Sequence, residues 1–313
     1  MKLKKPKFWD YKKPNIYSYL LWPLSILIKF INLIKILFVK KNNSPIKTIC
    51  VGNIYVGGTG KTSLSLKINE ILIKKKIKSC FVKKFYTNQI DEQNILENSG
   101  KLFKSEKRLD ALKQAAANGY KIAILDDGLQ DLSINYDINI VCFNNINWIG
   151  NGLTIPSGPL RENIKKIKKY KNVFLNGNDE NLDEIKKFIH KIEPDINIYQ
   201  GKYVQKNLNE FDLSDNFLVF SGIGNHETFI SMLKSNKFNI IKDIEFPDHY
   251  RYSSKDIEKI ISISKDYKCK IITTEKDYMR LNKIMHNDIK YIKVELEILN
   301  EKNFLKNISK LYE

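Results

Sequence analysis

A glycine-rich segment followed by Lys-Thr is the strongest chemical signal in this sequence. Residues 51–63 read V-G-N-I-Y-V-G-G-T-G-K-T-S, after a β-branched run at 45–51 and before apolar residues at helical spacing in 64–72. In this order of strand, glycine loop and helix, backbone N–H groups and a helix N-terminus can surround phosphate oxygens. Lys61 would reach the β- and γ-phosphates of a nucleotide, and the Thr62 hydroxyl would bind Mg²⁺. The sequence therefore predicts a nucleotide site made of Gly57, Gly58, Thr59, Gly60, Lys61 and Thr62.

Two aspartates follow a second buried strand. Residues 121–125 are K-I-A-I-L, and Asp126 and Asp127 come directly after them, before a glycine. A carboxylate at the carboxyl end of a strand beside a phosphate loop is where Mg²⁺ coordination is expected. One aspartate would bind the metal and the other would orient groups near the γ-phosphate. The alternative is a solvated turn, for which D-D-G is also suitable.

Three further segments hold residue types that could take part in the chemistry. A loop rich in Gly and Pro at 150–162 ends in Arg161-Glu162, which form either an ion pair or part of a site. Asp91-Glu92 comes between the phosphate loop and Asp126, and His249 lies in the segment F-P-D-H. Judged alone, the acidic pair is typical of a solvated surface. His249 is either a loop hydrogen-bonding residue or an acid–base group.

Alternating strands and helices must position these residues. The chain has 313 residues, 42% hydrophobic and 28% charged, which excludes a disordered protein and allows two domains at about 150 residues each. Polarity rises near residue 200, and strand and helix patterns alternate again beyond it. We predict an α/β fold with three parts: an N-terminal membrane-associated segment at 1–44, a P-loop NTPase-like domain with a parallel sheet at 45–200, and a second, smaller α/β domain at 201–313.

The N-terminal segment contains the longest apolar stretch, at residues 16–39. Its length is close to the ~20 residues that span a bilayer, but Lys29 and Lys35 lie inside it and Pro23 interrupts it. Ser25, Lys29 and Asn32 share one helix face, which favours a helix in the membrane interface with its apolar side in lipid and its lysines at the headgroups. A helix docked on its own domain, and a membrane span or uncleaved signal, are the alternatives.

The charge balance calls for an anionic partner. Lys and Arg number 53 against 35 Asp and Glu, so the net charge is +18. An anionic membrane surface or an anionic substrate fits this excess, and codon bias toward lysine explains part of it. Nucleic acid is disfavoured because the lysines are dispersed rather than gathered in one motif with interleaved aromatics. The four cysteines are far apart without a C-x-x-C pair, which indicates a reducing compartment.

Five motifs in this order resemble the tetraacyldisaccharide 4′-kinase family, lipid A pathway enzymes that phosphorylate a disaccharide lipid from ATP. The motifs are V-G-N-x-x-x-G-G-T-G-K-T at 51–62, D-D-G-x-Q at 126–130, G-N-G-x-x-x-P-x-G-P-L-R-E at 150–162, F-P-D-H at 246–249 and T-T-E-K-D at 273–277. The resemblance covers nearly the whole chain, including the apolar N-terminal helix.

The resemblance implies an activity, cofactors and a location. The enzyme would use ATP and Mg²⁺ to phosphorylate the 4′-hydroxyl of tetraacyldisaccharide 1-phosphate, giving lipid IVA for lipopolysaccharide. Its partners would be this lipid substrate and the anionic surface of the inner membrane, with no nucleic acid and no obligate protein partner. It would be a monotopic or peripheral protein on the cytoplasmic face of that membrane, with its site in the cleft between two α/β/α domains.

The resemblance also assigns roles to single residues. The Asp91–His249 dyad would deprotonate the sugar hydroxyl, with Lys61 as the third catalytic residue. The metal ligands would be Thr62, Asp126 and Glu162. The nucleotide-binding residues would be the glycine loop at 57–62 with Asp127, Gln130 and Arg161. The sequence departs from the family at Ile90, where the family has Gly before the aspartate, at Lys83–Tyr86, where it has S-R-G-Y, and at Asp131, where it has His.

A membrane-associated nucleotide switch of the partitioning-ATPase type is the alternative function. Those proteins share K-G-G-x-G-K-T, but they carry a lysine immediately before the two glycines, where this chain has Val56. The L-R-E and F-P-D-H segments would have no role in such a switch. The sequence therefore favours the lipid kinase.

Overall fold

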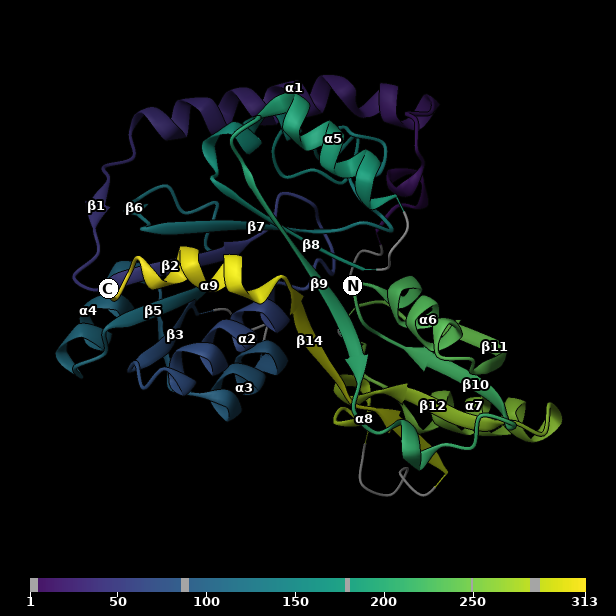
Figure 1. Ribbon diagram of the computed structural model, residues 1–313. Coiled ribbons are helices and arrows are strands. Elements are labelled where there is room, and N and C mark those ends of the chain that lie inside the picture. Colours follow the sequence, from purple (N-terminus) through teal and green to yellow (C-terminus); the bar gives the residue numbers. More distant parts are fainter. Residues whose placement is uncertain (1–4, 86–89, 178–180, 249, 282–287) are drawn as a thin grey trace. The chain divides into compact units, whose positions relative to one another are not determined.

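The computed structural model describes residues 5–85, 90–177, 181–248, 250–281 and 288–313 (Figure 1). The chain forms two compact units, one of Met1–Gly201 with Ile298–Glu313 and the other of Lys202–Glu297. The elements of the first unit are η1 (Lys7–Asp10), α1 (Ile16–Leu37), β1 (Asn42–Asn43), β2 (Lys47–Gly52), α2 (Lys61–Lys74), β3 (Ser79–Lys84), α3 (Ile90–Ser99), β4 (Leu102–Ser105), α4 (Arg108–Ala117), β5 (Ile122–Asp126), β6 (Ile134–Asn135), β7 (Ile138–Asn144), η2 (Ile164–Lys169), β8 (Asn172–Asn176), α5 (Leu182–Ile192) and α9 (Glu301–Ser309). The chain leaves this unit within β9 (Asn197–Gln205) and returns within β14 (Val294–Leu299).

The main sheet of the described residues has the strand order β14-β9-β8-β7-β2-β5-β3-β4. Neighbours from β9 to β4 pair in parallel, as expected for strands joined by helical crossovers. After β2 the chain places β3, β4 and β5 on one side of β2 and then crosses to place β7 on the other side. The strand order therefore reverses at β2. Ligands of open α/β sheets bind at the carboxyl ends of the strands at such a switch point. Val51 of β2 pairs with Asp126 of β5, so these two strands end at the same edge of the sheet.

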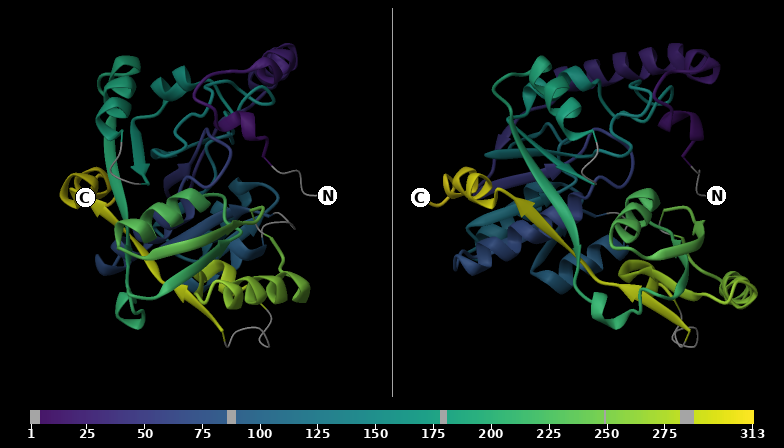
Figure 2. Two further views of the ribbon diagram at one scale, coloured as in Figure 1. Left: turned by 90° about the vertical axis from the view of Figure 1, so that its right-hand side faces the viewer. Right: turned by 45° about the vertical axis from the view of Figure 1, so that its right-hand side comes forward.

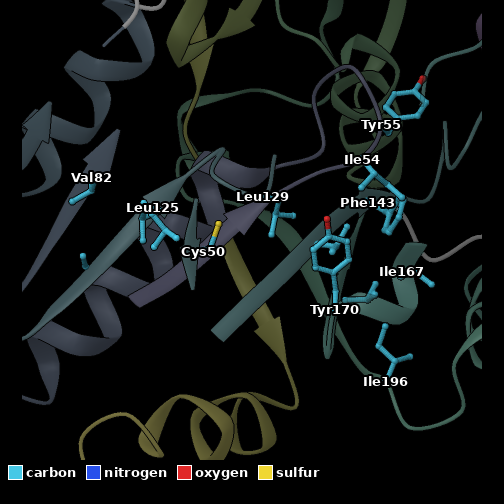
Figure 3. Close-up of a cluster of buried hydrophobic side chains, with 14 of the residues drawn as sticks. Cys50, Ile54, Tyr55, Val82, Leu125, Leu129, Phe143, Ile167, Tyr170 and Ile196 are labelled. Carbon is cyan, nitrogen blue, oxygen red and sulfur yellow. The ribbon is translucent and has the colours of Figure 1, made fainter. Parts of the chain in front are cut away.

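Both faces of this sheet are buried. Alternate residues of β2, β3 and β5, such as Cys50, Val82 and Leu125, enter one large apolar cluster with residues of α4, α5 and η2. Figure 3 shows this cluster continuing from Val82 and Leu125 toward Phe143 and Tyr170. On the other face, Phe304 of α9 packs edge-on against Tyr199 and Phe174, with ring centroids 5.0 and 6.3 Å apart. Burial on both sides explains why the strands are apolar throughout.

The C-terminal helix corrects the expected division of the chain. The sequence placed residues 201–313 in the second domain, but Ile298–Glu313 belongs to the first unit. The reason is that β14 pairs beside β9 in the main sheet, and α9 then buries Phe304 and Ile308 against that sheet. The last residues are therefore part of the first unit.

Phe304→Ala should destabilise the first unit by about 3–5 kcal/mol, the usual cost of emptying a fully buried aromatic site. Denaturant unfolding followed by fluorescence measures the change in free energy of unfolding. Phe188→Ala on α5 is the control, because that ring is 39% exposed and should cost less than half as much. Equal losses in the two variants would contradict the packing of α9 on the sheet.

The second unit is a smaller α/β/α layer structure. Its elements are η3 (Leu208–Glu210), β10 (Asn216–Ser221), α6 (His226–Ser235), β11 (Asn239–Glu245), α7 (Ser254–Asp266), β12 (Lys270–Thr274), α8 (Glu275–Tyr278) and β13 (Ile289–Ile292). The strands pair in parallel in the order β11-β10-β12-β13. Alternate residues of β10 enter different clusters: Leu218 and Phe220 pack with α7, and Phe217 and Val219 pack with α6. The predicted α/β/α architecture of this part is confirmed.

Candidate nucleotide and metal site

The segment between β2 and α2 has the geometry of a phosphate loop. Gly60 is the N-cap of α2 with φ of 78°, and Gly57 has φ of 139°, backbone conformations that favour glycine. Two buried side-chain amides fix Thr59 of this loop. Asn53 Nδ2 donates to Thr59 Oγ1 at 3.0 Å, and Asn176 Nδ2 donates to the Thr59 carbonyl at 2.6 Å. A helix that begins behind a glycine cap presents its first N–H groups and the positive end of its dipole to an anion.

Asp126 lies beside the first turn of α2. Its carboxylate is fully buried at the end of β5, and Thr62 Oγ1 lies 3.4 Å from Asp126 Oδ2. Ser65 Oγ, one turn further along α2, lies 3.5 Å from the other oxygen, Asp126 Oδ1. A hydroxyl and a carboxylate oxygen at this separation fit Mg²⁺, which prefers oxygen ligands and often uses one or two protein groups together with phosphate and water. Thr62 and Asp126, both predicted as metal ligands, are thus brought together.

Asp127, Lys61, Gln130 and Arg161 form a second group next to the loop. Arg161 Nη1 donates to Asp127 Oδ1 and to Gln130 Oε1, both at 2.9 Å, and Lys61 Nζ lies 3.9 Å from the same Asp127 oxygen. Burial would raise the pKa of the Asp127 carboxyl, but the charges of Lys61 and Arg161 outweigh it and lower that pKa. Gln130 Nε2 donates to the Asn53 carbonyl at 2.8 Å, which ties the group to the loop. The four residues that the sequence predicted here share one place in the fold.

Two basic residues that the sequence analysis did not select also hold this region. Arg108 at the start of α4 donates to the Asp127 carbonyl at 2.7 Å and pairs with Asp131 at 3.2 Å. It therefore fixes the turn after β5, in which Asp127 has a left-handed backbone with φ of 59°. Lys83 of β3 is 1% exposed, and its Nζ donates to Asp126 Oδ2 at 2.9 Å and to Glu92 of α3. The signal that could have identified Lys83 is its period-2 position with the buried Phe81.

Glu162 has other partners than those the sequence predicted. It accepts a hydrogen bond from the Tyr170 hydroxyl at 3.2 Å and pairs with Lys166 at 3.2 Å. Within the described ranges, no group of three or more His, Cys, Asp and Glu residues is arranged to hold a metal ion. Thr62 and Asp126 thus lie next to each other, while metal binding by Glu162 stays a prediction.

The expected catalytic dyad is described only in part. The backbone of Asp91 belongs to the first turn of α3, one residue before Glu92, and His249 lies outside the described residues. Both assignments therefore stay predictions.

The loop at 150–161 links the phosphate loop to the N-terminal helix. Val56 N donates to the Pro159 carbonyl at 2.8 Å, and Arg161 N donates to the Ile54 carbonyl at 2.7 Å. On its other side the loop contacts α1, because Ser25 Oγ donates to the Thr154 carbonyl at 2.9 Å. A similar contact joins Asn151 Nδ2 to Ser18 Oγ at 3.0 Å.

Helix α1 therefore docks on its own unit through small polar residues. Ser25 shares a helix face with Lys29 and Asn32, but it is buried against the loop, where its hydroxyl accepts a hydrogen bond from Ser157 N. The alternative of a helix docked on its own domain therefore describes this contact. Figures 1 and 2 show α1 at the edge of the first unit, away from α2 and α3. Large apolar side chains on α1 point outward, with exposed fractions between 53% and 80% for Leu20, Leu27, Phe30 and Leu37. By length and composition this helix could also cross a membrane.

Comparison with known proteins identifies the family. A family model described as tetraacyldisaccharide-1-P 4′-kinase matches residues 17–104 and 91–313. The chain belongs to this family. It is 59% identical over 313 residues to the tetraacyldisaccharide 4′-kinase of Pelagibacter ubique (strain HTCC1062), covering 100% of this chain and 99% of that one. It is 34% identical over 331 residues to the enzyme of Rickettsia canadensis (strain McKiel), covering 98% of each.

A solved structure supports the fold of the kinase. The crystal structure of LpxK from Aquifex aeolicus in complex with ATP superposes with a TM-score of 0.68 and 22% sequence identity, covering 95% of this chain and 100% of that one. The predicted P-loop α/β fold is thereby confirmed. Membership of the kinase family also confirms the predicted enzyme class, a kinase of lipid A biosynthesis. The exposed apolar face of α1 is compatible with membrane association of such an enzyme.

Proposed function

We propose that this kinase transfers the γ-phosphoryl group of ATP to the 4′-hydroxyl of tetraacyldisaccharide 1-phosphate and releases lipid IVA. The observation that carries the proposal is the joining of Lys61 and Thr62 of a phosphate loop with Asp126 and Asp127 at the adjacent strand end. Family membership supplies the acceptor class. The partitioning-type ATPase is set aside, because the relatives matched over nearly their whole length are kinases.

Each residue of the site has a defined task in this proposal. The glycine loop at 57–60 and the N-terminus of α2 bind the phosphate oxygens, and Lys61 neutralises charge on the β- and γ-phosphates. Thr62 and Asp126, with Glu162 as the third predicted ligand, would hold Mg²⁺, which would supply positive charge to offset that of the phosphates. Arg161, fixed by Asp127 and Gln130, adds a planar donor group that suits phosphate.

The acceptor hydroxyl needs a base. A sugar hydroxyl has a pKa far above 7, so a positioned carboxylate that accepts its proton as the bond to phosphorus forms lowers the barrier. We assign this task to Asp91, with His249 orienting and supporting it. Support comes from the motif resemblance and from the place of Asp91 at the start of α3, next to Glu92, whose side chain pairs with Lys83 beside Asp126.

A transfer assay tests the proposed function. Purified protein with γ-labelled ATP, Mg²⁺ and tetraacyldisaccharide 1-phosphate in detergent micelles should yield a labelled bis-phosphorylated lipid, with mass spectrometry locating the new phosphate at the 4′ position. Omission of Mg²⁺ and of the lipid are the controls. Hydrolysis of ATP without labelled lipid would point to a nucleotide switch instead.

We further propose that the outward face of α1 binds the cytoplasmic surface of the inner membrane. Burying a large apolar side chain contributes about 1.5–3 kcal/mol, so Leu27→Gln with Phe30→Gln should weaken binding to anionic vesicles by about tenfold or more. Both side chains are more than half exposed, so the melting temperature should stay unchanged. Vesicle co-sedimentation measures the partition.

Ile73→Gln provides the matched control for vesicle binding. Ile73 is an apolar residue on α2 that is 56% exposed, and its replacement should leave the partition unaltered. Vesicle binding by the double α1 variant at the wild-type level would refute the assignment of this face to the membrane.

A further inference from the structure

Lys83 is a buried lysine in direct contact with a predicted metal ligand. The register of β3 on β5 pairs Val82 with Leu125, so Lys83 comes level with Asp126 at the end of the neighbouring strand. Its ammonium bonds Asp126 Oδ2 at 2.9 Å, the same oxygen that Thr62 Oγ1 approaches at 3.4 Å. The side chain is 1% exposed, and Asp126 is wholly buried.

The second contact of Lys83 reaches a different element. The ammonium also pairs with Glu92 in the first turn of α3. One cation thus ties three parts of the first unit together: strand β3, the end of β5 and helix α3. Both carboxylates contact the buried ammonium, and two opposite charges at such short range favour its charged form.

We propose that Lys83 is an internal counter-ion that sets the Mg²⁺ requirement of nucleotide binding and positions α3 beside the metal site. This inference rests on the proposed function, in which Asp126 is a Mg²⁺ ligand. It adds Lys83 as a positioning residue, which affects Mg²⁺ binding through Asp126 and the position of Asp91 through α3.

The first consequence is electrostatic competition. A buried carboxylate without a partner is costly, and Lys83 stabilises Asp126 in the absence of metal. The same positive charge opposes a divalent cation at Asp126, because like charges a few ångströms apart repel strongly in a buried site. The nearby Lys61–Arg161–Asp127 group does not provide this balance, since its cations are matched to a different carboxylate.

The second consequence concerns α3. Asp91 precedes Glu92 directly, so any movement of the first turn of α3 moves the backbone of Asp91. The Lys83–Glu92 pair joins that turn to the strand end where Asp126 lies. Lys83 therefore acts on catalysis through α3 and through Asp126, without a proposed contact to substrate.

Lys83→Met tests the proposal, because methionine keeps an unbranched chain and removes the charge. Binding of a non-hydrolysable ATP analogue is measured by calorimetry over a series of free Mg²⁺ concentrations. The Mg²⁺ midpoint should fall by about tenfold, since Asp126 loses a competing cation. The kcat for lipid phosphorylation should fall by about tenfold as well, because α3 loses its tie. A change that only damaged the fold would raise the midpoint rather than lower it.

Glu92→Gln separates the effect on Mg²⁺ binding from the effect on α3. It also provides a second test if Lys83→Met fails to fold. It leaves the ammonium to Asp126 alone, so the Mg²⁺ midpoint should rise about two- to threefold while kcat falls. Lys104→Met is the matched control: it removes the surface pair of Lys104 with Glu97 at the other end of α3, and both readouts should keep their wild-type values.

The outcomes distinguish the inference from the function beneath it. If the wild type binds nucleotide independently of Mg²⁺, the proposed role of Asp126 as a metal ligand is refuted. Mg²⁺-dependent binding in the wild type, with the same midpoint in Lys83→Met, would overturn the counter-ion role alone. If Lys83→Met does not fold, a midpoint in Glu92→Gln that equals that of the wild type overturns it.

Discussion

Lys61→Met should lower kcat for phosphorylation of the lipid by about 10²- to 10³-fold. The phosphoryl group carries its charge on oxygens throughout the transfer, and catalysis depends on positioning and on neutralising that charge. Lys61 stands at the first position of α2, where its ammonium adds to the positive end of the helix, and it is 14% exposed. Methionine preserves the length and apolar part of the side chain but removes the charge. Initial rates at saturating ATP and Mg²⁺ measure the effect.

Two measurements make this expectation specific to the site. Lys74→Met, at the other end of the same helix, removes a lysine that is 70% exposed and pairs with Glu70, and its kcat should match the wild type. The melting temperature of Lys61→Met should be close to that of the wild type, because Arg161 still pairs with Asp127. A Lys61→Met enzyme with more than a tenth of wild-type kcat would contradict the role of Lys61.

Local patterns were sufficient to predict the two strands of the first unit that carry the site. The β-branched run at 45–51 is β2 (Lys47–Gly52), and the expected strand at 121–125 is β5 (Ile122–Asp126). They were readable because each is a β-branched run bounded by polar or turn residues, a pattern that survives burial on both faces. The phosphate loop was readable for a different reason, because glycines at 57 and 60 have backbone angles that other residues rarely adopt.

Long-range pairing could not be read in the same way. In the main sheet β14 lies beside β9, whose residues are almost a hundred positions earlier in the sequence. The local sequence L-E-I-L predicts a strand but does not indicate which sheet that strand joins. Helix α9 follows that strand, so its place in the first unit could not be predicted either. The burial of Phe304 is the consequence of that pairing.

Two features of the site were hidden by ordinary interpretations of residue type. Lys83 looks like a solvated residue in a lysine-rich chain, and only the alternation with Phe81 and the pairing of β3 with β5 turn it toward Asp126. On α1, Ser18 and Ser25 are seven residues apart, close to two helical turns, and so share a face. That spacing indicates a polar strip on the helix, but it does not indicate whether the strip contacts protein or lipid headgroups. The contacts with Asn151 and Thr154 show that protein does.

Asp91→Ala should lower kcat by about 10²-fold or more while nucleotide affinity is retained. In the proposed function a base acts on the acceptor proton, whereas the phosphate loop and the Asp127–Arg161 group bind the nucleotide. His249→Ala should give a loss of the same order. Rates with lipid in micelles and calorimetry with a non-hydrolysable ATP analogue separate the two parameters. Glu97→Gln, on the same helix with a 41% exposed carboxylate, is the control and should change neither.

The double variant Asp91→Ala with His249→Ala decides whether these residues act as a pair. Groups that perform one step together lose their contribution once, so the double variant should be little slower than the slower single variant. Independent roles would instead multiply the two losses, to about 10⁴-fold or more. The pH dependence gives a second criterion, since removal of the base should abolish the acidic limb of kcat/KM. An Asp91→Ala enzyme with near-normal turnover would contradict the assignment of Asp91 as the base.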